Sequence, residues 1–177
     1  SDVPERLAHD VGAGVVSACY IMGFVFHPLP RSDCRGGIVP ILVRPVREQL
    51  EHDRIIRLLQ ARYQKKHDPV TNIGHEPPTS IVIGTAEFVP DLILVTNDKA
   101  RKLEGVVEVE TGESVNSLEA LAQWGPFSKL RVPFHLYVPS NSLDTVRRLC
   151  RDHNVTVAEL WTYHTNLDQV RFTLVQK

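Results

Sequence analysis

The sequence predicts an α/β (α+β) fold in which helices flank a central mixed β-sheet. Three observations lead to this prediction. An amphipathic helical pattern follows Pro45, strand patterns fill the middle of the chain, and two further helical patterns separate the later strands. Strands that alternate with helices allow parallel neighbours, and the helices then cover both faces of the sheet.

Length and composition indicate one globular domain. The chain has 177 residues, of which 42% are hydrophobic and 23% are charged, enough for one sizeable core. The formal net charge is -1, so any surface for a polyanion would have to be local. The cysteines lie far apart without a CxxC pair, which argues against a zinc ribbon or a disulfide scaffold and favours a reducing cytoplasm.

Within this single domain of 1–177, we expect an N-terminal extension at 1–44 and a core at 45–177. An apolar stretch at 11–26 is too short for a membrane-spanning helix and follows no basic segment. We therefore expect neither a signal peptide nor a membrane role. The stretch is interpreted as a buried helix or a pair of strands, with an oligomer contact as one use for it.

The first helix is predicted to follow Pro45 and to cover 46–67. Its acids come early and its basic residues late, which suits the helix dipole. Residues 67–78 are then expected to form a loop. The apolar positions of the helix fall on one broad face, made of Val46, Leu50, Ile55, Ile56, Leu59 and Tyr63.

Strands take over after this loop. They are predicted at 80–84, 86–95 and 102–111, the first two as a hairpin or as sequential strands. A region rich in Ser and Asn opens a helix that ends near Trp124, and a short amphipathic helix begins at Ser142. The remaining strands are expected at 132–139, 155–164 and 169–176.

Three acids interrupt the apolar runs of the middle strands. Asp91 opens the run Leu-Ile-Leu-Val, and Glu108 and Glu110 lie within Val-Val-Glu-Val-Glu-Thr. Strand alternation places both glutamates on one face, with Val107 and Val109 on the other. Like charges this close raise a pKa unless a cation intervenes, and Mg²⁺ takes carboxylate and carbonyl oxygens. The pattern therefore predicts a metal site in which Asp91 adds a third carboxylate to Glu108 and Glu110, with the Val109 carbonyl as a further ligand.

The segment Val-Pro-Asp at 89–91, followed after a short hairpin by Glu108-Val109-Glu110, resembles the PD-(D/E)xK nuclease superfamily, which has the restriction-endonuclease-like fold. The order of elements over 45–139 is similar to the α-β-β-β-α-β core of that family. The resemblance implies that Asp91 and Glu108 bind the metal. Glu110 stands where the family usually has lysine, which implies that Glu110 orients or deprotonates the attacking water or recruits a second metal.

Two further site residues come from the same resemblance. Many family members carry a glutamate on the first core helix that contacts the metal through water; Glu51 is the first choice here and Glu48 the second. Gln123 begins the sequence Gln-Trp-Gly-Pro-Phe, which resembles the Q-x-x-x-Y element of some exonuclease-like members. In this chain Phe127 replaces the tyrosine, so the polar role of that ring is lost.

The favoured function is a Mg²⁺-dependent phosphodiesterase, a DNA endonuclease or exonuclease, with Mn²⁺ as an alternative metal. DNA is implied by the resemblance alone. Basic residues are expected to hold the phosphate backbone without reading its sequence. These residues are Arg54, Arg57, Lys65, Lys66 and Lys129.

Plainer interpretations stand beside this one. Glu108 and Glu110 also suit an edge strand whose acidic face meets water, and the basic helix surface suits simple solvation. A degenerate nuclease fold would keep the acids without turning over. The second functional hypothesis is therefore a non-catalytic binding or assembly module on that fold. A cytoplasmic homodimer is compatible with both hypotheses.

Overall fold

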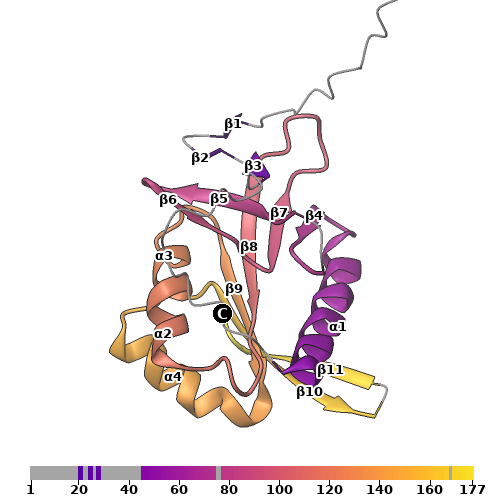
Figure 1. The fold of residues 1–177 in the computed structure, drawn as a ribbon, viewed down its shortest axis with the longest axis vertical. Coiled ribbons are helices and arrows are strands. Elements are labelled where there is room, and N and C mark those ends of the chain that lie inside the picture. Colours follow the sequence, from indigo (N-terminus) through magenta and orange to yellow (C-terminus); the bar gives the residue numbers. More distant parts are fainter. Residues whose placement is uncertain (1–19, 22–23, 26, 29–44, 75–76, 168) are drawn as a thin grey trace, which may run out of the picture.

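A mixed six-stranded sheet forms the centre of the protein (Figure 1). The computed structural model describes residues 20–21, 24–25, 27–28, 45–74, 77–167 and 169–177. The strand order is β11-β10-β9-β8-β7-β4, with β9 parallel to β8 and β10 and the other neighbours antiparallel. The strands are β4 (Asp68–Thr71), β7 (Leu92–Val95), β8 (Leu103–Val109), β9 (Phe134–Pro139), β10 (Glu159–Asn166) and β11 (Gln169–Gln176).

One face of this sheet is covered by α1 (Val46–Tyr63), which contacts β4, β7 and β8. The helix begins directly after Pro45, as predicted, because a proline there removes only an N–H that has no partner within the helix. The buried side chains of α1 are His52, Ile55, Ile56 and Leu59. The three apolar ones pack against Leu92, Leu94, Val107, Val109, Tyr137 and Tyr163.

The predicted apolar face of this helix is wrong at its first turns. Val46 is 79% exposed and Leu50 is 66% exposed, whereas His52 is buried. The sheet lies under the middle and the end of α1, so the first turns extend past the residues that contact β7 and β8. Periodicity predicts which face of a helix is apolar, but it does not predict at which residue the helix begins to pack against the sheet.

The opposite face is covered by two helical segments (Figure 1). The first is continuous through α2 (Ser117–Glu119), the π-helical turn η1 (Ala120–Trp124) and α3 (Gly125–Phe127). The Asn116 side chain caps it by accepting the N–H groups of Leu118 and Glu119. The second segment is α4 (Leu143–Asp152), which follows the 3₁₀ turn η2 (Ser140–Ser142).

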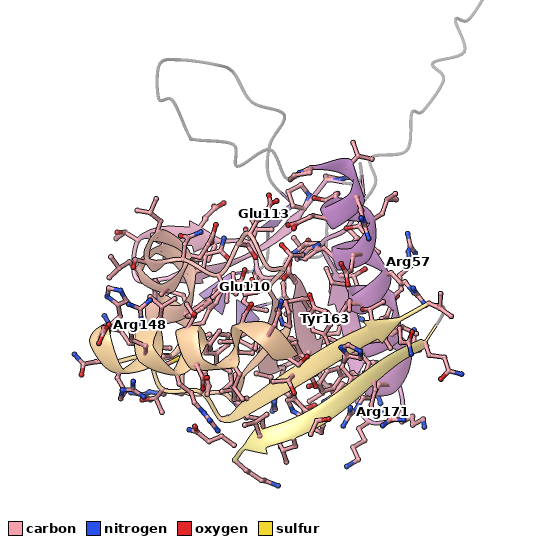
Figure 2. The ribbon with its side chains drawn as sticks, turned by 90° about the horizontal axis from the view of Figure 1, so that it is seen from below. Arg57, Glu110, Glu113, Arg148, Tyr163 and Arg171 are labelled. Carbon is pink, nitrogen blue, oxygen red and sulfur yellow. The ribbon has the colours of Figure 1, made fainter. Side chains whose placement is uncertain are left out.

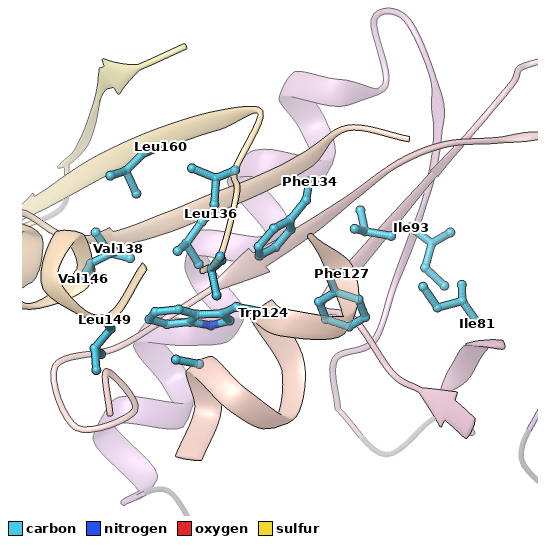
Figure 3. Close-up of a cluster of buried hydrophobic side chains, with 14 of the residues drawn as sticks. Ile81, Ile93, Trp124, Phe127, Phe134, Leu136, Val138, Val146, Leu149 and Leu160 are labelled. Carbon is cyan, nitrogen blue, oxygen red and sulfur yellow. The ribbon is translucent and has the colours of Figure 1, made fainter. Parts of the chain in front are cut away.

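The core beneath these two segments contains three buried aromatic rings, those of Trp124, Phe127 and Phe134 (Figure 3). Trp124 is fully buried and Phe127 is 1% exposed. They pack with aliphatic side chains of β7, β8, β9 and α4, among them Ile93, Val106, Leu136, Val138, Val146 and Leu149. Helices on both faces of a mixed sheet confirm the α+β class that the sequence predicts.

Two strand predictions need correction. Residues 67–78 were expected to form a loop, but β4 lies within them and pairs with β7 at the edge of the main sheet. The predicted strand at 86–95 is two strands, β6 (Ala86–Phe88) and β7, because Pro90 interrupts the pairing. The strand β6 instead forms the predicted hairpin with β5 (Thr79–Ile83), in a second sheet.

Three short strands precede α1 in the chain among the described residues. In the second sheet β5 also pairs with β3 (His27–Pro28). Within the apolar stretch at 11–26, β1 (Tyr20–Ile21) and β2 (Phe24–Val25) pair antiparallel, in line with the strand-pair interpretation; the rest of that stretch lies outside the described residues. Among the helices of the described ranges, none combines the length and the apolar character needed to cross a bilayer.

Candidate active site

The site begins where β7 and β8 part. Their antiparallel register pairs Leu92 with Val107, and the next position along brings Asp91 opposite Glu108. Asp91 Oδ2 accepts the N–H of Val109 at 2.8 Å, and the N–H of Asp91 donates to Glu108 Oε1 at 3.2 Å. The structure thus brings together two of the acids that the sequence singles out, on neighbouring strands.

Glu108 lies out of water, with 3% of its surface exposed. Burial raises the pKa of its carboxyl well above the ordinary value, and the charges of Asp91 and Glu110 raise this pKa further. The hydrogen bond from the Asp91 N–H acts in the opposite direction. Ionised Glu108 is therefore unfavourable in the protein alone, and a nearby cation would stabilise it.

A histidine that the sequence analysis did not select reaches the same place from α1. His52 Nε2 lies 3.1 Å from Asp91 Oδ1, and His52 Nδ1 lies 3.3 Å from Asp53 Oδ1. His52 is 3% exposed. A signal was present in the sequence, because His52 precedes Ile55 and Ile56 by three and four positions and so shares their buried helix face.

Glu110 meets the other helical layer. Trp124 Nε1 donates to Glu110 Oε1 at 2.7 Å, and the Ser114 hydroxyl donates to Oε2. The Tyr163 hydroxyl donates to the backbone oxygen of Glu110 at 2.7 Å. Val107 and Val109 pack on the α1 side, so Glu110 faces away from them, as strand alternation predicts.

Burial raises the pKa of Glu110 to about 7, although the hydrogen bonds from Ser114 and Trp124 lower it. Both carboxylate oxygens accept from fixed donors in a site that is 1% exposed. A buried carboxylate held in this way has a defined orientation. Figure 2 shows Glu110 and Tyr163 between the α1 and α4 sides of the molecule.

The loop after β8 connects these acids to α1. Ser114 Oγ accepts the N–H of Thr111, and the Thr111 hydroxyl donates to Glu48 Oε2 at 2.7 Å. Glu51, the first choice for the helix glutamate, instead accepts the Thr165 hydroxyl at 2.9 Å. Of the two candidates on α1, Glu48 is thus the one tied to the residue directly after Glu110.

A hollow of about 370 Å³ lies beside this loop. Glu51, Gly112, Tyr163 and Thr165 contribute to its lining. Since Tyr163 also contacts the Glu110 backbone, the hollow adjoins the acidic end of β8. Glu51 therefore lines the hollow next to the acids, but its hydrogen bond is to Thr165 of β10 and not to β8.

Gln123 occupies the π-helical turn η1 and is half-buried. The residue of this turn that donates to Glu110 is its neighbour Trp124. A π-helical turn inserts one extra residue per turn and redirects the side chains, and such turns are frequent at functional sites. The expected role of Gln123 stays a prediction.

The predicted phosphate-binding residues lie on the surface. Arg57, Lys65, Lys66 and Lys129 are exposed, with Lys129 in the turn after α3. Arg54 is half-buried, and its Nη1 donates to the Leu167 carbonyl at 3.4 Å. Figure 2 shows Arg57 on the α1 side of the view and Arg148 on the α4 side.

The carboxylate oxygens of Asp91 and Glu108 are ligands that suit a hard cation. Within the described ranges no three or more His, Cys, Asp or Glu side chains group as a metal site. Mg²⁺, however, is commonly bound through one or two carboxylates and keeps several waters. Asp91 and Glu108 supply two carboxylates, and each oxygen that already accepts one hydrogen bond has a second lone pair. The residues present therefore fit Mg²⁺ better than a metal that needs a full set of protein ligands.

No protein-family model matches the chain, and no curated protein or solved structure matches it either.

Proposed function

We propose that the chain is a Mg²⁺-dependent phosphodiesterase with a restriction-endonuclease-like core, acting on DNA. The observation that carries the proposal is the pairing of Asp91 with Glu108 at the shared end of two antiparallel core strands. Two carboxyl groups are held together there, and Glu108 is buried, so a bound cation would stabilise its ionised form. Along the main sheet the order is α1, β4, β7, β8, helix and β9, with β5 and β6 of the second sheet between β4 and β7 in the chain. This order, with β9 parallel to β8, supports the family resemblance of the sequence.

Each residue has a defined part in this proposal. Asp91, Glu108 and the Val109 carbonyl would hold the metal, with Mn²⁺ as an alternative to Mg²⁺. Bound in such a site, the metal lowers the pKa of a coordinated water and offsets charge on a phosphate. His52 keeps the Asp91 carboxylate in one orientation through the contact at 3.1 Å.

Glu110 is the proposed residue that orients or deprotonates the water. Its pKa of about 7 lies near neutral pH, where a general base is most effective. Trp124 and Ser114 fix the direction of its oxygens. Basic side chains at the surface, including Arg57, Lys65 and Lys66, would hold the phosphate backbone.

The two hydrogen bonds to the Glu110 side chain favour a second candidate function. Both oxygens of Glu110 accept hydrogen bonds from the protein, so the carboxylate already has the partners of a structural group. Glu110 then anchors the segment α2–η1–α3 on the sheet, and the domain is a non-catalytic binding or assembly module. A homodimer formed through the N-terminal extension fits this module and is tested by sedimentation of the full chain.

Cleavage of plasmid and single-stranded DNA with Mg²⁺ or Mn²⁺ distinguishes the two candidates. The parent is compared with Asp91→Asn and Glu108→Gln, which keep the size of each side chain. Glu113→Gln is the matched control, because Glu113 is an exposed acid in the loop just after Glu110. Cleavage by the parent and by Glu113→Gln alone supports the nuclease; absence of cleavage and of metal binding in the parent supports the module.

A further inference from the structure

A second hollow, of about 480 Å³, lies between the end of α1 and strands β9 and β10. Aromatic and histidine side chains make up much of its wall. Three cations, Arg62, Lys65 and Lys66, also line it, against one carboxylate, Glu159. The hollow is therefore positively charged and aromatic at the same time.

The carboxylate of Glu159 is already engaged by the protein. Its Oε2 accepts Trp161 Nε1 at 2.9 Å and lies 3.2 Å from His135 Nδ1, while Oε1 lies 3.9 Å from Lys177 Nζ. Over the described residues, no acidic oxygen comes within ion-pair distance of Arg62, Lys65 or Lys66. These three positive charges remain available to an anion.

A flat cationic surface forms one wall. The guanidinium carbon of Arg62 lies 4.2 Å from the centre of the Trp161 ring, and the Tyr137 ring stacks on Trp161 with an interplanar angle of 8°. Arg62 as a whole is exposed, so a ligand can reach its side chain from solvent. A guanidinium plane held in this way is a stacking partner for a nucleobase.

The floor of the hollow offers a hydrogen-bond donor. The hydroxyls of Tyr63 and Tyr137 lie 3.0 Å apart and share one hydrogen bond. Two hydroxyls carry two protons, so the second proton remains for an acceptor outside the pair. Phosphate oxygens accept from such a hydroxyl and from the ammonium groups of Lys65 and Lys66.

We infer that this hollow binds a nucleotide, with the base stacked on Arg62 and the phosphate near Lys65 and Lys66. A helix that ends in basic residues is often only solvated there, in keeping with its dipole. Here Arg62, Lys65 and Lys66 line a hollow that also contains the stacked rings of Tyr137 and Trp161 and a tyrosine hydroxyl. Basic residues that are only solvated need no such neighbours. The nucleotide comes either free or as part of a single strand, and binding does not depend on the proposed cleavage at Asp91 and Glu108.

The test measures binding by the full chain in EDTA, so that cleavage cannot occur. A fluorescent oligothymidylate of about twelve nucleotides, within the usual site size, is titrated by anisotropy, and AMP by calorimetry. Asp91→Asn and Glu108→Gln should bind as the parent does, even where they abolish cleavage. A failure of the nuclease proposal is therefore separated from a failure of this one.

Arg62→Lys keeps the positive charge and removes the planar guanidinium group. We therefore expect the oligonucleotide to bind about tenfold more weakly, as the loss of one stacked base predicts. Lys66→Ala should weaken binding and reduce its dependence on salt. Arg148→Ala is the matched control, an exposed arginine on α4, and should bind like the parent. Thermal unfolding of each variant confirms that it is folded.

Competition identifies the source of the ligand. Displacement of the oligonucleotide by AMP indicates a site for free nucleotides, and binding of the strand without displacement indicates a strand site. Ribose 5-phosphate, which lacks a base, should compete poorly. The inference is overturned if neither probe binds, if ribose 5-phosphate competes as well as AMP, or if Arg148→Ala weakens binding as much as Arg62→Lys.

Discussion

At the point where β7 begins, the carboxylates of Asp91 and Glu108 each accept a backbone N–H from the neighbouring strand. The Asp91 carboxylate accepts the Val109 N–H at 2.8 Å, and the Glu108 carboxylate accepts the Asp91 N–H at 3.2 Å. Each acid thus satisfies a backbone N–H next to the paired segment of β7 and β8. Separation of the two carboxylates by a change of rotamer would therefore break a hydrogen bond to the backbone.

This arrangement predicts that Mg²⁺ stabilises the folded protein. A cation that binds the folded pair and not the unfolded chain adds about 2.7 kcal/mol when its concentration is about a hundred times the dissociation constant. Thermal unfolding with MgCl₂, compared with NaCl at equal ionic strength, measures the shift. Glu108→Gln should lose the Mg²⁺ response, while Glu113→Gln should keep it. Identical responses in all three proteins would contradict a site at Glu108.

Stability should fall as the pH rises through the titration of Glu110. Burial raises its pKa from the ordinary 4.5 to about 7, so the folded state binds the proton more tightly than the unfolded state. The contribution of Glu110 is therefore complete below pH 4.5 and is lost as the pH rises through about 7. At about 1.4 kcal/mol for each pKa unit, the loss is on the order of 3 kcal/mol.

Urea unfolding in EDTA at a series of pH values checks this prediction. Glu110→Gln cannot ionise and should flatten the dependence, leaving the part that comes from the raised pKa of Glu108, which has the same sign. Glu113→Gln serves as the control and should retain the slope of the parent. If the parent and Glu110→Gln lost stability in parallel, the buried ionisation of Glu110 would not be the cause.

Trp124→Phe should destabilise the protein by about 2 kcal/mol, because it removes the indole donor to a buried carboxylate and keeps an aromatic ring in the core. The bond that is lost joins Trp124 Nε1 to Glu110 Oε1 at 2.7 Å. The matched variant is Trp161→Phe, whose indole donates to Glu159 in a half-buried site and should have a smaller effect. Chemical denaturation of both variants gives the comparison, and an equal loss would argue against a special role for the Glu110 bond.

The main strands and helices could be predicted because each has a clear period. Alternation predicts that Val107 and Val109 lie on one face of β8 and Glu108 and Glu110 on the other. In the structure the two valines pack with α1, whereas Glu110 contacts Trp124. The strand β4 was missed because it contains Pro69, which has no N–H and reads as a loop residue. At the edge of a sheet that missing donor is tolerated. The edge position of β4 results from tertiary packing, which the local sequence does not show.

The partners of the acids could be predicted only in part. Glu48 and Glu51 lie one helical turn apart, so periodicity alone does not decide which of them reaches the loop after β8. Trp124, which donates to Glu110, lies in a π-helical turn, and such a turn has no clear sequence signal. Glu48 and Trp124 therefore meet the acidic strand for reasons of packing rather than of local pattern.

His52 is predicted to position Asp91 for metal binding. Its Nε2 lies 3.1 Å from Asp91 Oδ1, and its other ring nitrogen lies 3.3 Å from Asp53 Oδ1, so the ring is held between two carboxylates. Groups that orient metal ligands typically contribute about 10-fold to 100-fold in affinity. His52→Leu should therefore weaken Mn²⁺ binding by a factor in this range, measured by isothermal titration calorimetry.

A purely structural role for His52 would give a different result. Leucine fills the buried position on the core face of α1, and replacing a buried paired group by an apolar one is often neutral for stability. We therefore expect His52→Leu to unfold in urea like the parent in EDTA while it binds Mn²⁺ more weakly. His164→Leu, at an exposed histidine of β10, should change neither quantity. If His52→Leu lost stability in EDTA but kept the Mn²⁺ affinity of the parent, His52 would support the fold and not the metal site. The two roles can be separated because the orientation of Asp91 affects Mn²⁺ binding and not unfolding in EDTA.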